Sequence, residues 1–366
     1  MNKEQKIAAF DPSQPGLADN SIFGLPFTAE ESEIVIIPVP WEVTVSYGAG
    51  ASEGPDAILE ASFQVDLHHQ EYPDLWKLGI HFDKSEQTKQ WAEASAKFKA
   101  MAQPVIAALE SGHEIAALPS LQADLDQINT VCRTLHDEVR ERTLYWLNQN
   151  KKVALLGGDH STPLGYYEAL ATKHDNFGIL HLDAHMDLRI AYEGFTYSHA
   201  SIMYNALQLP QISRIVQVGI RDFAEQEVNV ANEYSDRVHV HTDIDLKAET
   251  FRGVTWEQQC DAILLALPQK VAISFDIDGL YPWYCPNTGT PVPGGFSFEQ
   301  AAYLLSKLAA SEKEIIGFDL VEVAPGEDDW DGNVGARMLF HMCGVFASNN
   351  DLATGSKLKF NRNVAK

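Results

Sequence analysis

The sequence predicts an α/β fold in which a doubly wound parallel β-sheet is covered by helices on both faces. From residue 153 onward, short apolar runs alternate with longer segments of helical spacing, a pattern typical of βαβ units. Side chains of the type that bind metals directly follow several of these runs. Because the carboxyl ends of parallel strands form one edge of such a sheet, these side chains are expected to meet there.

The predicted strands are short runs rich in Val, Ile and Leu, as expected for strands buried on both faces. They span 34–40, 153–156, 177–182, 215–219, 237–241, 271–275 and 315–318. The first helix after the first strand is predicted to begin near Pro55, because proline suits a first helical turn. Further helices are predicted over 86–112, 120–149, 163–173, 256–266 and 298–310.

The chain divides by composition into an arm, one domain and a tail. Residues 1–32 are rich in Pro, Gly, Ser and acids, which predicts an irregular N-terminal arm. Residues 33–350 predict a single α/β domain that carries the site, and 351–366 a C-terminal tail. Within that domain, 86–150 is a helical segment that is either an insertion or the early helices of the sheet domain.

The composition excludes several classes of partner. A formal net charge of −24 over 366 residues repels nucleic acids and anionic membranes, so neither is an expected partner. The chain contains no uncharged apolar run of the roughly 18 residues that a membrane helix needs, and no signal peptide is evident at its start. Four cysteines without a CxxC pair predict free thiols in a reducing compartment, and hence a cytoplasmic location.

The ligand-type side chains lie in three segments of the chain. The first is 157–161, Gly-Gly-Asp-His-Ser, and the second is 181–187, His-Leu-Asp-Ala-His-Met-Asp. In the second, three ligand-type residues alternate with apolar ones, so on a strand they point to the same side. The third segment, 274–278, repeats this alternation. The candidate metal ligands are therefore His160, Asp183, His185, Asp187, Asp276 and Asp278.

The charge of this set predicts two divalent ions. Four converging carboxylates repel one another, and buried ones must be paired or shift their pKa values until they are neutral. Two divalent ions would balance the four negative charges. Carboxylate and imidazole ligands without a thiolate favour Mn, Fe, Co, Ni or Zn.

These motifs resemble those of the ureohydrolase superfamily, which includes arginase, agmatinase, guanidinobutyrase, guanidinase and formimidoylglutamase. The resemblance extends over roughly 34–345 and is carried by 157–161, 183–187, 274–280, 288–291 and 319–323. It implies an arginase-like, three-layer α/β/α fold and a homo-oligomer, either a trimer or a hexamer. It also implies two Mn²⁺ ions as cofactors, with Ni²⁺, Co²⁺ or Fe²⁺ as alternatives.

The resemblance also implies a role for each site residue. One metal would be held by His160, Asp183, Asp187 and Asp276, and the other by His185, Asp183, Asp276 and Asp278. A hydroxide that bridges the two ions would attack the guanidino or formimino carbon. Asp187 would pass a proton to the leaving nitrogen, His199 would move protons at the mouth of the site, and Glu322 would bind the cationic nitrogens of the substrate.

The substrate is not settled by these motifs. Arg189 lies two residues after Asp187, and a cation there would favour a carboxylate tail, as in arginine, guanidinobutyrate or formiminoglutamate, unless it pairs with Asp222, Glu193 or another acid. The loop 192–199 is closer to agmatinase-type loops. We therefore expect a guanidino-compound hydrolase of the agmatinase or arginase type that releases urea and an amine. The alternatives are a formimidoylglutamase that releases formamide and a non-catalytic homologue that binds metal.

Two further observations concern residues near the ligands. Many relatives carry an aspartate where this chain has Tyr281, which is expected to line either the pocket or a subunit contact. His181, His239 and His241 lie on or near predicted strands, and we interpret them as structural.

Overall fold

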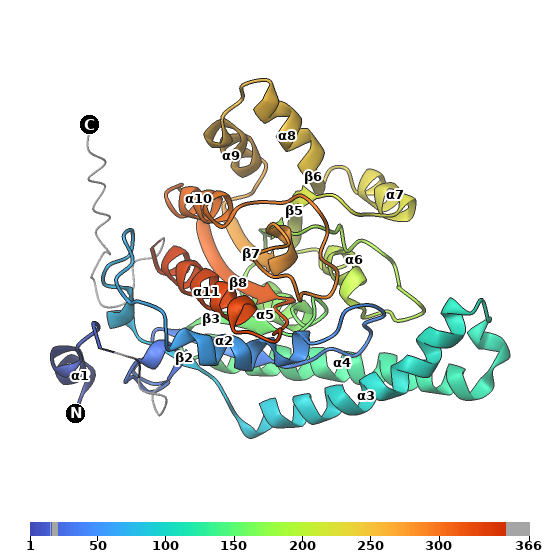
Figure 1. The fold of residues 1–366 in the computed structure, drawn as a ribbon, viewed down its shortest axis with the longest axis horizontal. Coiled ribbons are helices and arrows are strands. Elements are labelled where there is room, and N and C mark those ends of the chain that lie inside the picture. The colour runs from blue at the N-terminus through green and yellow to red at the C-terminus, as the bar shows by residue number, and fades with distance from the viewer. Residues whose placement is uncertain (15, 17–20, 349–366) are drawn as a thin grey trace.

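The computed structural model describes residues 1–14, 16 and 21–348, and a single eight-stranded parallel sheet forms its centre (Figure 1). The strands are β1 (Ile34–Val39), β2 (Ile80–Phe82), β3 (Lys152–Gly157), β4 (Phe177–Leu182), β5 (Ile212–Ile220), β6 (Val238–Thr242), β7 (Lys270–Asp276) and β8 (Glu314–Val321). In space their order is β2-β1-β3-β8-β7-β4-β5-β6. The last strand of the chain therefore lies in the middle of the sheet, between β3 and β7.

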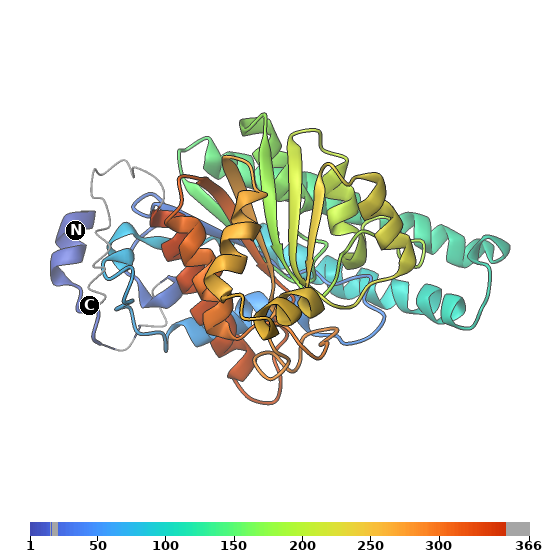
Figure 2. The ribbon, with the colours of Figure 1, turned by 90° about the horizontal axis from the view of Figure 1, so that it is seen from above.

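Helices cover both faces of the sheet, as Figure 2 shows from above. The α-helices are α1 (Lys3–Ala9), α2 (Gly54–Ser62), α3 (Glu86–Glu110), α4 (Pro119–Leu147), α5 (Leu164–Lys173), α6 (Ile202–Leu207), α7 (Glu225–Glu233), α8 (Asp243–Phe251), α9 (Trp256–Leu265), α10 (Phe298–Ala309) and α11 (Trp330–Ser348). Helices α2, α9, α10 and α11 contribute to one buried apolar cluster, and α3 to α7 to the other. The predicted doubly wound, three-layer fold is confirmed.

All seven predicted strands are present, but short or weakly patterned elements were missed. Strand β2 has only three residues at the edge of the sheet, so no alternation was long enough to reveal it. Helices α6, α7, α8 and α11 were not predicted either. Of the helices in the described residues, none is long and apolar enough to cross a lipid bilayer.

The N-terminal arm is more ordered than its composition predicts. Helix α1 forms because Asn2 and Gln5 cap each other reciprocally, each side chain bonding to the backbone N–H of the other. Further along, Phe23 and Leu25 are buried in the apolar cluster beside α11. The predicted irregular arm therefore contains one short helix and buried apolar residues. The predicted tail, 351–366, lies outside the described residues.

Candidate metal centre

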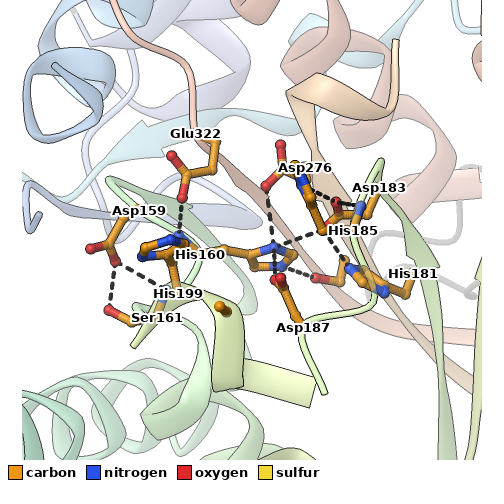
Figure 3. A network of polar contacts seen from close by, with 12 residues as sticks. Asp159, His160, Ser161, His181, Asp183, His185, Asp187, His199, Asp276 and Glu322 are labelled. Carbon is orange, nitrogen blue, oxygen red and sulfur yellow. Dashed lines mark hydrogen bonds and ion pairs between the residues drawn. The ribbon is translucent and has the colours of Figure 1, made fainter. Parts of the chain in front are cut away.

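The turn after β3 delivers the first histidine of the site. Gly158 passes so close to Trp41 that a Cβ atom would lie 2.1 Å from the Trp41 carbonyl oxygen, so only glycine fits there. The buried Asp159 carboxylate then accepts hydrogen bonds from the backbone N–H of Ser161 at 3.0 Å and from its hydroxyl at 2.5 Å. This tight turn directs the His160 ring over the carboxyl ends of the neighbouring strands (Figure 3).

Three carboxylates converge on one nitrogen of His160. The Nδ1 atom lies 3.0 Å from Asp183 Oδ2, 3.0 Å from Asp187 Oδ2 and 3.2 Å from Asp276 Oδ2. His160 is buried, and one N–H proton cannot serve three acceptors. Four such atoms around one point are the ligands that a divalent ion of the manganese or zinc type takes. The arrangement brings together the first predicted ligand set.

The far side of the His160 ring fixes its tautomer. Ser274 donates its only hydroxyl proton to Asp319 Oδ1 at 2.8 Å, and Tyr167 donates to Asp319 Oδ2 at 2.7 Å. The 2.9 Å contact between His160 Nε2 and Ser274 Oγ must then be a bond donated by the imidazole. In the neutral ring Nδ1 then carries no proton, and its lone pair is free to bind a metal ion.

A second group of ligand atoms lies beside the first. His185 Nδ1 is 3.0 Å from Asp278 Oδ2 and 3.4 Å from Asp183 Oδ1. Asp183 thus presents Oδ2 to His160 and Oδ1 to His185, so one carboxylate contacts both groups of ligand atoms. Asp278 is oriented by the backbone N–H of Ala184, which donates to its Oδ1 at 3.0 Å.

A row of polar side chains supports the ligands one layer below them. Neighbouring strands place Gln217, His181, Ser274 and Asp319 in register across β5, β4, β7 and β8. The Gln217 amide donates to His181 Nδ1 at 3.0 Å, so His181 Nε2–H donates to Asp183 Oδ2 at 2.8 Å. His181 thus has the structural role that we predicted, and this role is to hold the candidate ligand Asp183 in place. His181 and Ser274 each stand two positions before a candidate ligand in an otherwise apolar strand, a signal that could have indicated their supporting role. Gln217 and Asp319 carry no such signal.

The electrostatics of the cluster favour bound cations. Burial raises the pKa of Asp276 well above its ordinary value, and the nearby Asp278 and Asp183 carboxylates raise it further. Dications between these groups would relieve both effects. With a buried His160 Nδ1 that has no hydrogen-bond partner among the described residues, the donor set fits two divalent ions.

Two acidic residues of the site have left-handed backbone conformations. Asp187 has φ 54° and Glu322 has φ 64°, a region that costs non-glycine residues energy and that is frequent at functional sites. The Asp187 carbonyl is held by the backbone N–H groups of Met203 at 3.0 Å and Tyr204 at 3.2 Å. Glu322 is held through its Oε1, which accepts the backbone N–H of His160 at 2.8 Å.

Five of the six candidate metal ligands line a cavity of about 260 Å³, and Asp183 lies buried behind them. Its walls come from the loop after β1, the loop after β4 and the start of α7. The lining residues outside the ligand set are Val45, Ser46, Tyr47, Gly48, Arg189, Tyr192, His199, Ala200, Asp222, Phe223, Ala224, Glu227, Gly289, Thr290 and Glu322. All predicted site residues except Asp183 therefore line this cavity, and Asp183 contacts two of them, His160 and His185.

The predicted functional residues outside the ligand set have distinct surroundings. Burial raises the pKa of Glu322 well above its usual range, and Asp276 raises it further. Desolvation of the partly buried His199 ring lowers its pKa to about 4. Arg189 lies 3.8 Å (Nε to Oε2) from Glu227 and 4.7 Å from the centre of the Tyr192 ring, so its charge already has partners.

Tyr281 lies outside the cavity lining. Its ring stacks on that of Trp283, with centroids 4.3 Å apart, and the Lys247 ammonium lies 5.3 Å from its centroid. Trp283 is exposed. The tyrosine therefore belongs to a surface cluster, and the alternative that it lines the pocket was wrong.

A second cluster of ligand-type residues, His69, Glu71 and His341, lies outside the lining of this cavity. His341 belongs to α11, and the cluster contacts Ser306 of α10. His69 Nδ1 accepts the backbone N–H of Glu71 at 3.1 Å, and His341 Nε2 donates to the Ala302 carbonyl at 3.1 Å. His69 Nε2–H then donates to His341 Nδ1 at 3.3 Å. Each nitrogen has a complementary partner, and His341 Nε2 also lies 3.4 Å from Ser306 Oγ, so this cluster needs no ion.

Comparison with known proteins identifies the family. The sequence profile described as the Arginase family matches residues 32–344. The chain belongs to the arginase family. An N(1)-aminopropylagmatine ureohydrolase of Thermus thermophilus is 31% identical to this arginase-family chain over 86% of it and 91% of the relative. An agmatinase of Bacillus anthracis is 27% identical over 82% of this chain and 87% of the relative.

Solved structures agree with this membership of the arginase family. The agmatine ureohydrolase of Thermoplasma volcanium has the same fold, with a TM-score of 0.67 at 22% identity over 94% of this chain and 97% of that chain. The arginase of Bacillus subtilis has a TM-score of 0.60 at 22% identity, over 86% and 99%. Membership confirms the predicted enzyme class, a metal-dependent ureohydrolase that acts on linear C–N bonds other than peptide bonds.

Proposed function

We propose that the chain is a two-manganese ureohydrolase that converts a small guanidino compound with a cationic tail to urea and an amine. Glu322 carries this proposal. It is a buried carboxylate in the cavity beside the metal ligands, and it forms no ion pair with a lysine or arginine of the described residues. A guanidinium group would supply the missing cation through charge-assisted hydrogen bonds.

The charges of the cavity support a cationic rather than an anionic tail. Apart from the metal ligands, its lining contains the acids Asp222, Glu227 and Glu322 and one cation, Arg189. Arg189 lies beside Glu227 and over Tyr192, so a substrate carboxylate would compete with an existing carboxylate for it. The names of the relatives, N(1)-aminopropylagmatine ureohydrolase and agmatinase, also support a tail that ends in an amine.

The chain's own residues divide the work of the reaction. Ions held by the six ligands would supply a hydroxide at neutral pH to attack the guanidino carbon. Glu322 holds the guanidinium in line with the metal ligands. Asp187, which faces His160 Nδ1 from the left-handed turn, accepts the proton of the nucleophile and passes it to the leaving nitrogen. His199 lines the cavity and exchanges protons with solvent as the amine leaves.

The test is a product assay with the manganese-loaded chain. Urea and formamide are measured with agmatine, N(1)-aminopropylagmatine, arginine, 4-guanidinobutyrate and formiminoglutamate. We expect urea, with kcat/KM for one of the two amine-tailed substrates at least about tenfold above that for arginine or guanidinobutyrate, since an unpaired buried charge disfavours the wrong tail.

Each other outcome identifies an alternative. Formamide from formiminoglutamate alone would replace this proposal by a formimidoylglutamase. Faster urea release from arginine or guanidinobutyrate would show that Arg189 reads a carboxylate. No product with both ions bound would leave a non-catalytic homologue. A homo-oligomer and a cytoplasmic location stay predictions from the sequence.

A further inference from the structure

Helices α3 and α4 form a long antiparallel hairpin whose far end projects beyond the rest of the molecule in both views (Figures 1 and 2). This is the helical segment that sequence analysis left without a role. Near the sheet, the hairpin contacts two loops that line the catalytic cavity. One is the 42–48 loop, which contributes Tyr47, and the other is the 190–199 loop, which contributes Tyr192 and His199.

Helix α3 holds the 42–48 loop through Glu42, whose side chain is 1% exposed. Lys99 Nζ donates to Glu42 Oε2 at 2.6 Å, and Ser95 Oγ accepts the backbone N–H of Glu42 at 2.8 Å. The other carboxylate oxygen of Glu42 accepts the backbone N–H of Gly50 at 2.8 Å. The Glu42 carboxylate therefore connects both ends of the loop, Glu42 and Gly50, to α3. It can be buried because Lys99 neutralises its charge.

Helix α4 holds the 190–199 loop through Asn129. Its Oδ1 accepts the backbone N–H of Thr196 at 2.9 Å, and its Nδ2 donates to the Gly194 carbonyl at 3.1 Å. Gly194 has φ +79°, and a Cβ atom there would lie 2.9 Å from Leu125 of the same helix. The side-chain amide thus replaces a strand partner for the segment between Tyr192 and His199.

We propose that the α3–α4 hairpin is a positioning element of the active site, in which Lys99, through Glu42, and Asn129 set the shape of the cavity entrance. Neither residue contacts a candidate metal ligand in the described part of the chain. They hold the 42–48 and 190–199 loops, which line the path of the substrate tail. We therefore expect them to affect substrate binding more than metal binding. The kinetic part of this proposal rests on the proposed ureohydrolase function.

The test compares Lys99→Met and Asn129→Ala with matched controls on the same helices. Lys97→Met removes an exposed lysine of α3, and Thr134→Ala removes an exposed hydroxyl that bonds only within α4. With the manganese-loaded proteins, we expect two ions per chain in all four variants. KM for the preferred guanidino substrate is expected to rise about tenfold in each hairpin variant, as expected for the loss of one or two loop-holding hydrogen bonds. The controls should behave like the unchanged protein.

Amide hydrogen exchange tests the same proposal without any turnover. Exchange of the 190–199 amides is expected to quicken about tenfold in Asn129→Ala, and that of the 42–50 amides in Lys99→Met, since each loses its anchor. If urea is never formed but exchange quickens in this way, the proposed function fails and the positioning role stands. Exchange unchanged in both loops, or KM unchanged despite quicker exchange, would overturn the proposal. If Asn129→Ala does not fold, Asn129→Asp keeps the acceptor for Thr196 and loses only the donor.

Discussion

The metal centre and the His69–Glu71–His341 cluster both consist of histidines and acidic residues. They differ in whether each hydrogen-bond acceptor has a donor. In the second cluster each imidazole nitrogen meets a complementary group, down to the 3.3 Å bond between His69 and His341. In the first, His160 Nδ1 faces three carboxylate oxygens within 3.2 Å. Hydrogen bonds satisfy the polar atoms of the His69–Glu71–His341 cluster, whereas those of the metal centre require cations.

The comparison shows that proximity of ligand-type residues does not by itself define a metal site. Buried polar atoms are normally satisfied, so a set of acceptors with too few protons is the more telling observation. The supporting residues add to it. Ser274 and Asp319 hold a proton on the far nitrogen of His160, so that in the neutral ring the near nitrogen is the one that can bind a metal ion.

The largest expected effect comes from replacing a ligand. Asp276→Asn should remove at least one ion per chain and lower urea release by more than roughly 100-fold, because several kcal/mol of charge stabilisation are lost. Elemental analysis gives the metal content, and circular dichroism shows that the chain is folded. Glu71→Gln, the matched change in the second cluster, should alter neither quantity. Full turnover by Asp276→Asn would contradict its assignment as a ligand.

A smaller effect is expected for the unpaired carboxylate of the cavity. Glu322→Gln keeps an oxygen that can accept the His160 N–H but loses the charge that binds a guanidinium. We expect two bound ions and a fall in kcat/KM of about 10- to 100-fold, the value of a hydrogen bond to a charged group. Steady-state kinetics on metal-loaded protein provide the measurement. An unchanged kcat/KM would remove Glu322 from substrate binding.

Removing a serine hydroxyl beside each cluster should affect manganese affinity at the metal centre only. Ser274→Ala removes the group that fixes the His160 tautomer, and manganese affinity should fall about 10- to 100-fold, as for other residues that orient metal ligands. Titration with a metal indicator measures the dissociation constant. Ser306→Ala removes a hydroxyl that bonds to Glu71 at 2.6 Å in the second cluster, and we expect its affinity for manganese to be unchanged.

The smallest effect on activity is expected in the second cluster itself. His341→Gln breaks the bond to His69 and should lower the free energy of unfolding by about 1–3 kcal/mol, since a buried hydrogen-bonded group is lost. Denaturant unfolding followed by fluorescence measures this change. Urea release and metal content should stay as in the unchanged protein. A loss of one ion would mean that this cluster binds metal after all.

The sequence predicted the ligands because each follows an apolar strand directly. Asp183 and Asp276 each come at the end of such a run. The strand alternation predicted for 183–187 and 276–278 was wrong, because β4 ends at Leu182, Asp187 has a left-handed backbone and Asp278 lies in a 3-10 turn. The turns that follow the strands, rather than a shared strand face, bring the later ligands to the site. The bond from Ser274 to Asp319 was not predictable in this way, because it depends on the register between β7 and β8, which only the folded sheet defines. The contact between Arg189 and Glu227 likewise joins a loop to a helix that the sequence did not reveal.

The position of β8 has a consequence for how the protein is made. This strand is the last of the sheet to leave the ribosome, yet it fills the central place between β3 and β7. His160 lies on the turn after β3 and Asp276 is the last residue of β7, so their final spacing is set only when β8 enters between the two strands. Parallel pairings between distant segments form slowly. During synthesis β3 and β7 therefore lack their common neighbour until β8 has been made. We therefore expect metal uptake to be a late step of biogenesis, which follows translation of the chain beyond Val321.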